Sequence, residues 1–309
     1  MKYFRILLIL LLSLSIAKSA ENYEVIIEPI KQRKSSLDIN PYSRLNRKSS
    51  DLLKSGFYKS IALGAGYYHY GEVDMRGKFV MRMDMVALNI ALNLGYAKGG
   101  GKIDFYADAN VAMGAYTGSV LDTSNETKNG KRLVAFDLNS FYHLELKGGY
   151  DLLSQSGFDS ALYLQSGIGY YFNRNDFSAL ERLQGYLYIP VQVEGEVILS
   201  QNWALNLMGG YNFFIFGHHH SKSTKSQFSK DLRVIQREGA GASAFIGATY
   251  RTASGNINAF GLKYEFWSVG GSPSSELMTD YSGDTTKPIR LYEPDNVSHI
   301  LALQYVWRF

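Results

Sequence analysis

Apolar and polar side chains alternate along most of this chain, from residue 57 to the last residue. Turn-rich stretches divide the alternating part into ten segments, which cover residues 57–70, 78–96, 102–118, 132–150, 160–172, 186–199, 203–216, 240–252, 256–268 and 298–309. Alternation puts every second side chain on the same face of a β-strand. The pattern therefore predicts an all-β fold of about ten strands, each with one apolar face and one polar or small face.

The lengths and ends of these segments favour a barrel in a membrane over a soluble sandwich. A tilted strand crosses a bilayer with about 9–11 residues, whereas strands of soluble proteins average about 5–6. Aromatic side chains gather near segment ends, as at 67–70, 170–172 and 307–309, where membrane barrels carry their interfacial girdles. Short and long connections also alternate. We expect a transmembrane antiparallel up-and-down β-barrel with apolar faces toward lipid, and keep the soluble sandwich as the alternative.

The first residues, MKYFRILLILLLSLSIAKSA, have the layout of a secretory signal peptide. Lys2 and Arg5 precede an apolar run, and small residues follow it, which predicts cleavage after Ser19. A membrane anchor is the alternative, but the run has only about half the length that spans a bilayer. We expect a signal peptide at 1–19, a polar, basic, weakly structured periplasmic extension at 20–56, and the barrel at 57–309.

The chain ends on LALQYVWRF, which places Leu301, Leu303, Tyr305, Trp307 and Phe309 on one strand face. Together with the signal peptide and the alternating segments, this ending resembles that of bacterial outer-membrane β-barrel proteins, whose last strand usually ends in an aromatic residue. The general style is also similar to small outer-membrane proteins of Helicobacter and Campylobacter relatives. The resemblance implies a bacterial outer-membrane location and recognition of Tyr305, Trp307 and Phe309 by the barrel-assembly machinery. It implies no activity.

Composition and charge agree with an exported, strand-rich chain. The chain has 23 Tyr, 17 Phe and 30 Gly but only 6 Pro; aromatic residues favour strands, and proline avoids sheet interiors. It has no cysteine, so it forms no disulfide. Loss of Lys2, Arg5 and Lys18 with the signal peptide lowers the formal net charge from +4 to +1, which argues against nucleic acid as a partner.

Charged side chains fall mainly opposite the apolar face, which assigns them to the lumen. The expected polar network of the lumen comprises Arg82, Asp84, Asp104, Asp108, Asp137, His143, Glu145, Lys147, Glu194, Glu196, Arg251, Lys263, Glu265 and Arg308. A ten-stranded barrel is only slightly wider than an eight-stranded one, whose interior side chains can fill, and buried charges need partners. We expect these side chains mostly to fill the lumen. The alternative is a narrow, mildly cation-selective channel lined by the same acids.

The segment at 78–96 does not keep one phase. Its apolar side chains occupy odd positions up to Met85 and even positions from Val86 onward. One extra residue in a strand would cause such a shift. We expect a β-bulge near Met85–Val86 or an upper strand that leaves the membrane, with Arg82 and Asp84 on the lumenal face.

The stretch Gly217-His218-His219-His220 is a weak candidate for metal binding. His218 and His220 would share a strand face, and neutral imidazoles bind zinc, nickel or copper. Carboxylates close in sequence are lacking until Asp231. A solvated polar loop is the alternative, and we predict no cofactor.

Two kinds of enzyme are built on similar barrels, and their sequence motifs test whether this chain has enzymatic activity. Omptin proteases have an Asp-x-His pair at the outer rim, and this chain has no Asp-x-His. Lipid A deacylases have His-x-Ser followed by Asn on a strand; the nearest match, His219-His220-Ser221, continues with Lys222 in an expected loop. We therefore expect no enzymatic activity.

The sequence thus predicts a structural or interaction protein whose long outer loops contact an extracellular ligand. Outer-membrane lipid, lipopolysaccharide and the barrel-assembly machinery are its other expected partners. A narrow porin-like channel is the alternative, and an outer-membrane protease or lipid A-modifying enzyme is the second alternative.

Overall fold

The computed structural model describes residues 51–119, 131–156, 158–175, 181–226, 228–273, 276–278 and 289–309. The predicted signal peptide and residues 20–50 of the predicted extension lie outside these ranges. Within the described residues, no helix is long and apolar enough to cross a membrane.

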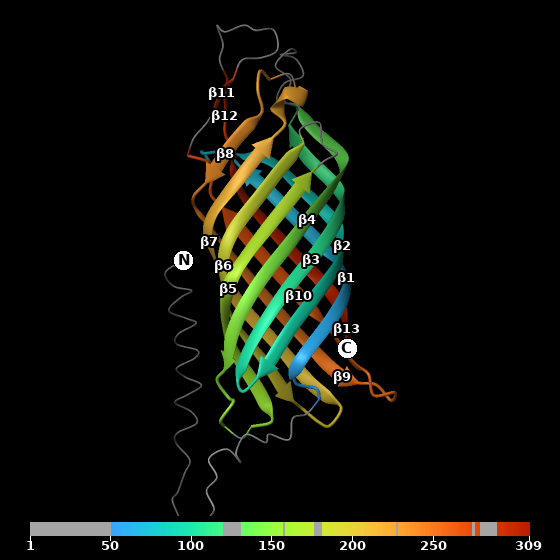
Figure 1. The fold of residues 1–309 in the computed structure, drawn as a ribbon. Coiled ribbons are helices and arrows are strands. Elements are labelled where there is room, and N and C mark those ends of the chain that lie inside the picture. The colour runs from blue at the N-terminus through green and yellow to red at the C-terminus, as the bar shows by residue number, and fades with distance from the viewer. Residues whose placement is uncertain are drawn as a thin grey trace, which may run out of the picture. The chain divides into compact units, whose positions relative to one another are not determined.

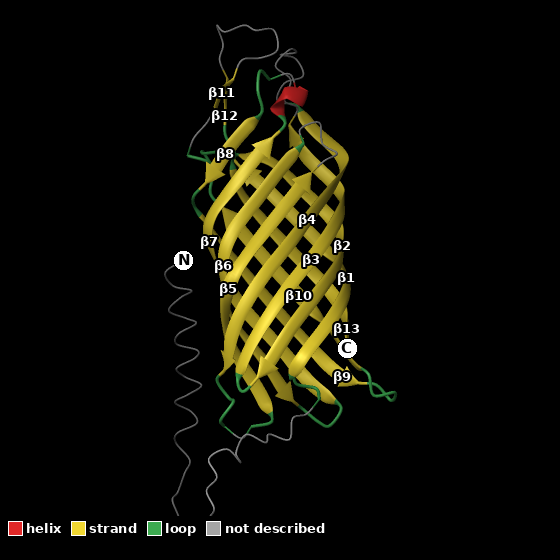
Figure 2. Ribbon diagram, viewed as in Figure 1, coloured by secondary structure: helices red, strands yellow, loops and turns green. Residues whose placement is uncertain are grey.

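Ten long antiparallel strands form a closed barrel (Figures 1 and 2). The strands are β1 (Gly56–Val73), β2 (Phe79–Lys98), β3 (Gly101–Ser119), β4 (Arg132–Asp151), β5 (Ser160–Asn175), β6 (Arg182–Ile198), β7 (Trp203–Ser221), β9 (Gly239–Arg251), β10 (Ile257–Val269) and β13 (Asp295–Arg308). Each strand pairs with the strands before and after it in this order, and β13 pairs with β1. The ten-stranded antiparallel barrel predicted from the alternation is confirmed.

The last strand closes the barrel against the first. β13 and β1 pair in a continuous register that begins with Ser60 opposite Arg308. The pairing extends beyond β13, because the Phe309 N–H donates to the Lys59 carbonyl oxygen at 3.0 Å. Closure leaves neither strand with a free edge. The chain therefore ends inside a hydrogen-bonded sheet and not in a frayed tail.

The two ends of the barrel differ in the length of their connections. One end has short turns, among them Gly99-Gly100 between β2 and β3, whose φ values of 59° and 86° suit a two-residue hairpin. The other end has longer connections, which contain η2 (Ser223–Ser226), β8 (Leu232–Gln236), β11 (Glu276–Met278) and β12 (Ile289–Leu291). Membrane barrels turn their short connections toward the periplasm. We therefore call the first end periplasmic and the second extracellular.

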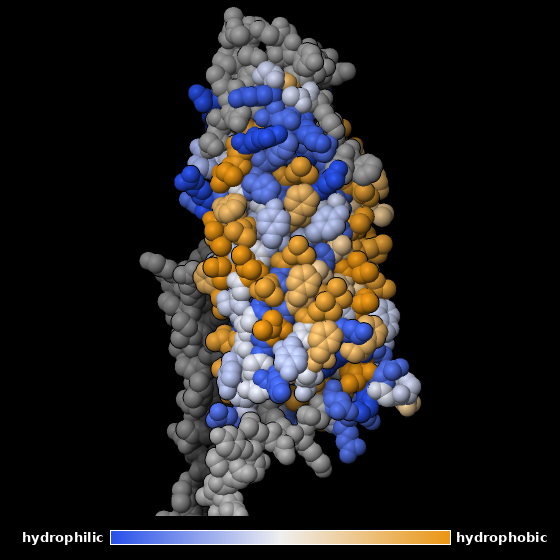
Figure 3. Space-filling view, viewed as in Figure 1, coloured by the Kyte–Doolittle hydropathy of each residue, from blue (hydrophilic) through white to orange (hydrophobic). Residues whose placement is uncertain are grey.

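A belt of apolar side chains covers the outside of the barrel. Leu303 on β13 is 69% exposed, and Leu88, Leu144 and Ile168 on three other strands are each at least 50% exposed. Figure 3 shows apolar side chains over the middle of one face and polar ones at its upper end. Soluble proteins rarely expose so large an apolar surface. The belt is therefore the surface that meets lipid, which excludes the soluble sandwich.

β2 keeps one alternation through Met85–Val86, so the bulge predicted there is wrong; its register with β1 shifts instead at Phe79–Met81. The registers of β2 with β1 and β3 are unbroken at Met85–Val86. Met81, Met83 and Met85 point into the lumen and are at most 3% exposed. The apolar side chains change face along β2 because the extracellular part of the lumen is itself apolar.

Arg82 and Asp84 point outward, and not into the lumen as the sequence suggested. Their side chains are 53% and 35% exposed, and Arg82 Nε lies 3.1 Å from Asp84 Oδ2. β2 has 20 residues, more than the about 9–11 that cross a bilayer. The extracellular part of β2 therefore extends past the apolar belt. This agrees with the alternative expectation for this segment, an upper strand that leaves the membrane.

Candidate functional site

Closely packed aromatic rings occupy the extracellular half of the lumen. The aromatic plug, as we call it, consists of Tyr68, Tyr70, Phe141, Tyr171, Tyr186, Tyr188 and Trp267, each at most 2% exposed. The centroid of the Trp267 ring lies 4.9 Å from that of Tyr188 and 5.6 Å from that of Tyr186. The rings come from β1, β4, β5, β6 and β10 and touch at these distances. The β2 methionines pack against them.

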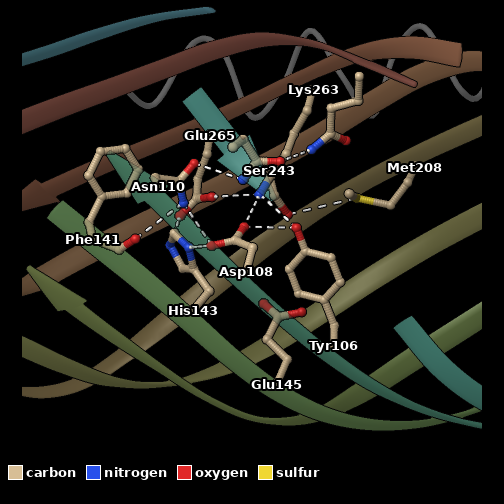
Figure 4. A network of polar contacts seen from close by, with 12 residues as sticks. Tyr106, Asp108, Asn110, Phe141, His143, Glu145, Met208, Ser243, Lys263 and Glu265 are labelled. Atoms are coloured by element: carbon tan, nitrogen blue, oxygen red, sulfur yellow. Dashed lines mark hydrogen bonds and ion pairs between the residues drawn. The ribbon is translucent and has the colours of Figure 1, made fainter. Parts of the chain in front are cut away.

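A charged network adjoins the plug on its periplasmic side and joins β3 and β4 to β10 (Figure 4). His143 lies between two carboxylates: its Nδ1 is 2.8 Å from Asp108 Oδ1, and its Nε2 is 2.5 Å from Glu265 Oε1. Lys263 Nζ lies 2.7 Å from Asp108 Oδ2 and 3.5 Å from Glu265 Oε2. The structure thus brings together four of the residues expected in the lumen, and each buried charge has a partner of opposite sign.

A second network lies nearer the periplasmic end. Lys102 Nζ is 3.0 Å from Asp104 Oδ2 and 2.5 Å from Glu194 Oε2. The Tyr58 hydroxyl donates to Asp104 Oδ1, and Gln165 Nε2 donates to Asp104 Oδ2 at 2.8 Å. Asp104 and Glu194, both expected in the lumen, therefore share a buried lysine that the expected set did not include.

Three further residues expected in the lumen point inward and make contacts outside these two networks: Glu145, Lys147 and Asp137. Lys147 Nζ donates to Glu145 Oε2 at 2.5 Å, and the Tyr188 hydroxyl donates to Glu145 Oε1 at 2.9 Å. Asp137 Oδ2 accepts from Asn175 Nδ2 at 2.8 Å, toward the extracellular end. The Tyr188 contact ties the plug to the charged residues on its periplasmic side.

The remaining three expected residues lie at the periplasmic mouth and contact residues 51–54, which precede β1. Arg308 Nη1 donates to the Leu52 carbonyl oxygen at 2.8 Å. Arg251 Nη1 lies 3.2 Å from Asp51 Oδ2. Glu196 Oε1 lies 3.5 Å from Lys54 Nζ. The mouth therefore holds residues of the predicted weakly structured extension.

Two lysines that complete these networks were missed from the sequence, for different reasons. Lys102 shares the even-numbered phase of Asp104 and Asp108 in its segment, so the alternation does contain a signal for it. Lys54 lies before the first alternating segment, so no periodicity points to it. Burial alone would disfavour the Lys54 ammonium, but the carboxylates of Glu194 and Glu196 hold its pKa well above the usual value.

A cavity of about 220 Å³ occupies the periplasmic half of the lumen. Charged side chains of β3, β4 and β6 line it, as do Lys263 and Glu265 of β10 and Arg308 of β13. Small and apolar side chains of β9, β10 and β13 complete the lining. The charged side chains from β3, β4 and β6 include Asp104, Glu145, Lys147 and Glu194, and the small or apolar ones include Ser243, Phe245, Ala259 and Val306. Asn212 Oδ1, buried in the lining, has no hydrogen-bond partner among the described residues. The cavity has room for several waters or one small polar molecule.

His218 and His220 share the outer face of β7, but each has a separate neighbour. The ring of His218 stacks on Tyr170 with centroids 6.2 Å apart, and His220 Nε2 lies 3.3 Å from Asp231 Oδ2. Across the described residues, no group of three or more His, Asp or Glu side chains is placed to hold a metal ion. The metal site at His218 and His220 stays a prediction.

His219 points into the lumen from β7, toward Ser221 and Glu293, although its sequence stretch was expected to lie in a loop. Its Nε2 lies 2.5 Å from Ser221 Oγ and 3.0 Å from Glu293 Oε2, whereas its Nδ1 has no hydrogen-bond partner within the described ranges. A catalytic triad needs serine and acid on opposite imidazole nitrogens. Because both contacts use Nε2, these side chains do not have triad geometry.

The extracellular rim carries its own buried charges. Arg182 pairs with Glu72, and Gln184 Nε2 donates to Glu293 Oε1 at 2.6 Å. Burial alone would raise the pKa of Glu293, but His219 and Arg182 hold it below the usual value. Glu293 is therefore an ionised acceptor at neutral pH, and it ties the loop before β13 to the barrel wall.

Barrel closure, an outward apolar belt and unequal ends define a transmembrane β-barrel of the bacterial outer-membrane type. The fold is similar to that of the outer membrane protease OmpT from Escherichia coli, with a TM-score of 0.55 at 12% identity over 84% of this chain and 100% of that chain. Together, the fold and the belt place the protein in a bacterial outer membrane.

Two other solved structures align less closely. OprG from Pseudomonas aeruginosa has a TM-score of 0.36 at 10% identity, over 82% of this chain and 97% of that chain. A major outer membrane protein from Thermus thermophilus has a TM-score of 0.31 at 14% identity, over 82% of this chain and 99% of that chain. No family model matches the chain, and no curated protein matches its sequence.

Proposed function

We propose that the protein is a structural or interaction protein of the outer membrane, a barrel with a filled lumen that presents extracellular loops. The observation that carries the proposal is the aromatic plug. Tyr171, Tyr186 and Trp267 are each at most 1% exposed and come from three strands. A channel needs a path for water or ions, and rings packed at these distances oppose one.

The pairing of the lumenal acids supports the same proposal. A cation-selective channel would use Asp104, Asp108 or Glu194 to attract ions. Each of these carboxylates already lies within 3.0 Å of the ammonium of Lys102 or Lys263. Neutralised acids of this kind stabilise a filled interior and attract permeant cations weakly.

The extracellular rim supports a role in contacts with other molecules. Phe228, Leu232 and Val234 form a small apolar cluster against which Leu291 packs. β8 extends the sheet from β7, and β11 pairs with β12. Loops held on a rigid scaffold are the usual carriers of binding. Under this proposal the rim contacts an extracellular ligand, and the outer wall contacts lipid and lipopolysaccharide.

A liposome-swelling assay tests the proposal. Vesicles that hold the folded protein are placed in solutions of small sugars or amino acids, beside protein-free vesicles and vesicles with an open general porin. We expect the protein to leave permeability at the protein-free level. Swelling that approaches the porin rate would refute the proposal and favour the channel.

Proteolysis is the second candidate, because the fold is similar to that of an outer membrane protease. Its difficulty is that Ser221, His219 and Glu293 lack triad geometry. Cells that express the protein can be tested for cleavage of a peptide panel and, by mass spectrometry, for loss of lipid A acyl chains. Activity that disappears in Ser221→Ala would favour the enzyme, and no difference from cells without the protein would favour the structural role.

A further inference from the structure

Four residues in front of the barrel fold back into its periplasmic mouth. We call Asp51–Lys54 the mouth segment. Leu52 and Leu53 are 1% and 7% exposed, a burial that a loose tail would not produce. Gly56, the first residue of β1, has a φ of 64°. This left-handed conformation, which favours glycine, lets the chain reverse at the rim and enter the mouth.

Side chains from several strands hold the mouth segment. Arg308 on β13 donates to the Leu52 carbonyl oxygen at 2.8 Å, and Arg251 on β9 lies 3.2 Å from Asp51 Oδ2. Leu53 packs with Ala161 and Tyr163 of β5 in an apolar cluster of its own. The segment therefore touches the barrel wall on opposite sides of the mouth.

Lys54 provides the contact that reaches furthest into the lumen. Its ammonium contacts Glu194 and lies 3.5 Å from Glu196 Oε1 on β6, and its backbone N–H donates to Glu196 Oε2 at 3.0 Å. Lys54 also lines the cavity of about 220 Å³. The aromatic plug lies beyond the other end of this cavity, so the mouth segment stands between the cavity and the periplasm.

We propose that the mouth segment is a releasable stopper, which closes the lumenal cavity to the periplasm and admits small polar solutes when it leaves. The segment is only four residues long, and its polar contacts through Asp51, Lys54 and the Leu52 carbonyl oxygen are ones that water can replace. Withdrawal would expose Glu194 and Glu196 to water, which solvates them, so release does not leave buried charges unpaired. This inference goes beyond the proposed function, because a stopper on one side of the plug opens a chamber and no through path.

The absence of cysteine from the chain makes a direct test possible. Ser243→Cys places a single thiol in the cavity wall, and its reaction with methyl methanethiosulfonate, a small neutral reagent, reports access. We expect slow labelling of Ser243→Cys alone. Adding Lys54→Glu, which sets a carboxylate against Glu194 and Glu196, should raise the labelling rate at least tenfold.

A second variant and a matched control separate release from other effects. Gly56→Val strains the reversal without changing any charge, and it should also speed labelling of Ser243→Cys. Lys98→Glu makes the same charge change at an exposed lysine of the periplasmic end, and it should leave the rate unchanged. All variants are compared only after they show the gel shift between unboiled and boiled samples that marks a folded barrel.

Equal labelling rates with and without Lys54→Glu and Gly56→Val would overturn the proposal, whether the rates are fast or slow. Fast rates throughout would mean that the mouth is open, and slow rates throughout would mean that another element closes it. The result is independent of the proposed function. Solute flux through the wild-type protein would refute the filled barrel, but it would not decide whether the mouth segment controls access to Ser243→Cys.

Discussion

Lys263 on β10 and Asp108 on β3 meet inside the barrel, with Nζ 2.7 Å from Oδ2. Three strands, β2, β1 and β13, separate β10 from β3 in the barrel wall. The pair therefore reaches across the lumen and ties together parts of the wall that share no backbone hydrogen bonds. His143 and Glu265 complete the tie, because His143 contacts both Asp108 and Glu265.

Removal of one partner of this cross-lumen pair should destabilise the barrel strongly. We expect Lys263→Met to lower the free energy of unfolding by about 3–5 kcal/mol, because Asp108 keeps a buried charge without its ammonium. Adding Asp108→Asn should recover part of the loss. Urea unfolding in lipid vesicles, followed by tryptophan fluorescence, measures both.

Lys78→Met is the control for this pair, since Lys78 lies in the exposed turn between β1 and β2. Substitutions of that kind change stability by about 0.5 kcal/mol or less. If Lys263→Met unfolds at the same urea concentration as Lys78→Met, the pair does not stabilise the barrel.

The extracellular rim should loosen in acid. Burial opposes ionisation of Glu293, but His219 and Arg182 hold its pKa below the ordinary value of about 4.5. A carboxyl group with a lowered pKa in the folded state stabilises that state above its unfolded pKa and loses this effect as the pH falls through the folded value. Hydrogen exchange of the rim, corrected for the intrinsic rate, should therefore increase below about pH 4.

Glu293→Gln should remove this acid response and raise exchange at neutral pH as well. Glu238→Gln, at an exposed carboxyl group of the same rim, should behave like the wild type. An acid response that persists in Glu293→Gln would assign the effect to another group.

The alternation along the chain predicted the barrel because a strand that faces lipid on one side leaves a regular trace in the sequence. The same alternation correctly assigned Asp108, His143 and Lys263 to the lumen. It also places Lys102 on the lumenal face, although Lys102 was not included in the expected network. Alternation shows which residues share a strand face, but it does not show whether that face meets lipid or points into the lumen. At Met81–Met85 the apolar side chains fill the lumen, so the rule that apolar means outward misplaced Arg82 and Asp84.

Contacts of residues outside the alternating segments leave no periodic pattern in the sequence. The mouth segment is four residues long and gains its order from Arg308, Arg251 and Glu196, which lie far away in the sequence. The pairing of Glu293 with His219 likewise joins a loop to β7. Such contacts follow from closure of the barrel, and a single sequence does not encode them in any local pattern.

The terminal aromatic residue should matter more for assembly than for stability. Phe309 is 61% exposed and its backbone N–H donates to the Lys59 carbonyl oxygen, so its ring buries little apolar area inside the protein. We expect deletion of Phe309 to reduce the yield of membrane-inserted protein in cells severalfold, while the barrels that do form unfold within about 1 kcal/mol of the wild type.

Tyr305 and Trp307 belong to the same proposed assembly signal and provide a comparison. Their rings pack together on the outer face with centroids 4.7 Å apart. Leu301→Ala, which changes the same face away from the end, is the control and should assemble at nearly the wild-type yield. Equal yields for the wild type and the Phe309 deletion would mean that the barrel-assembly machinery does not read this residue.

The filled lumen is tested most directly by single-channel recording of the purified, folded protein in a planar lipid bilayer. We expect a current that cannot be distinguished from that of the protein-free bilayer, because the aromatic plug fills the lumen and Asp104, Asp108 and Glu194 are paired. Discrete, reproducible openings whose cation selectivity falls in Asp104→Asn, Asp108→Asn or Glu194→Gln would contradict the filled barrel and establish a channel.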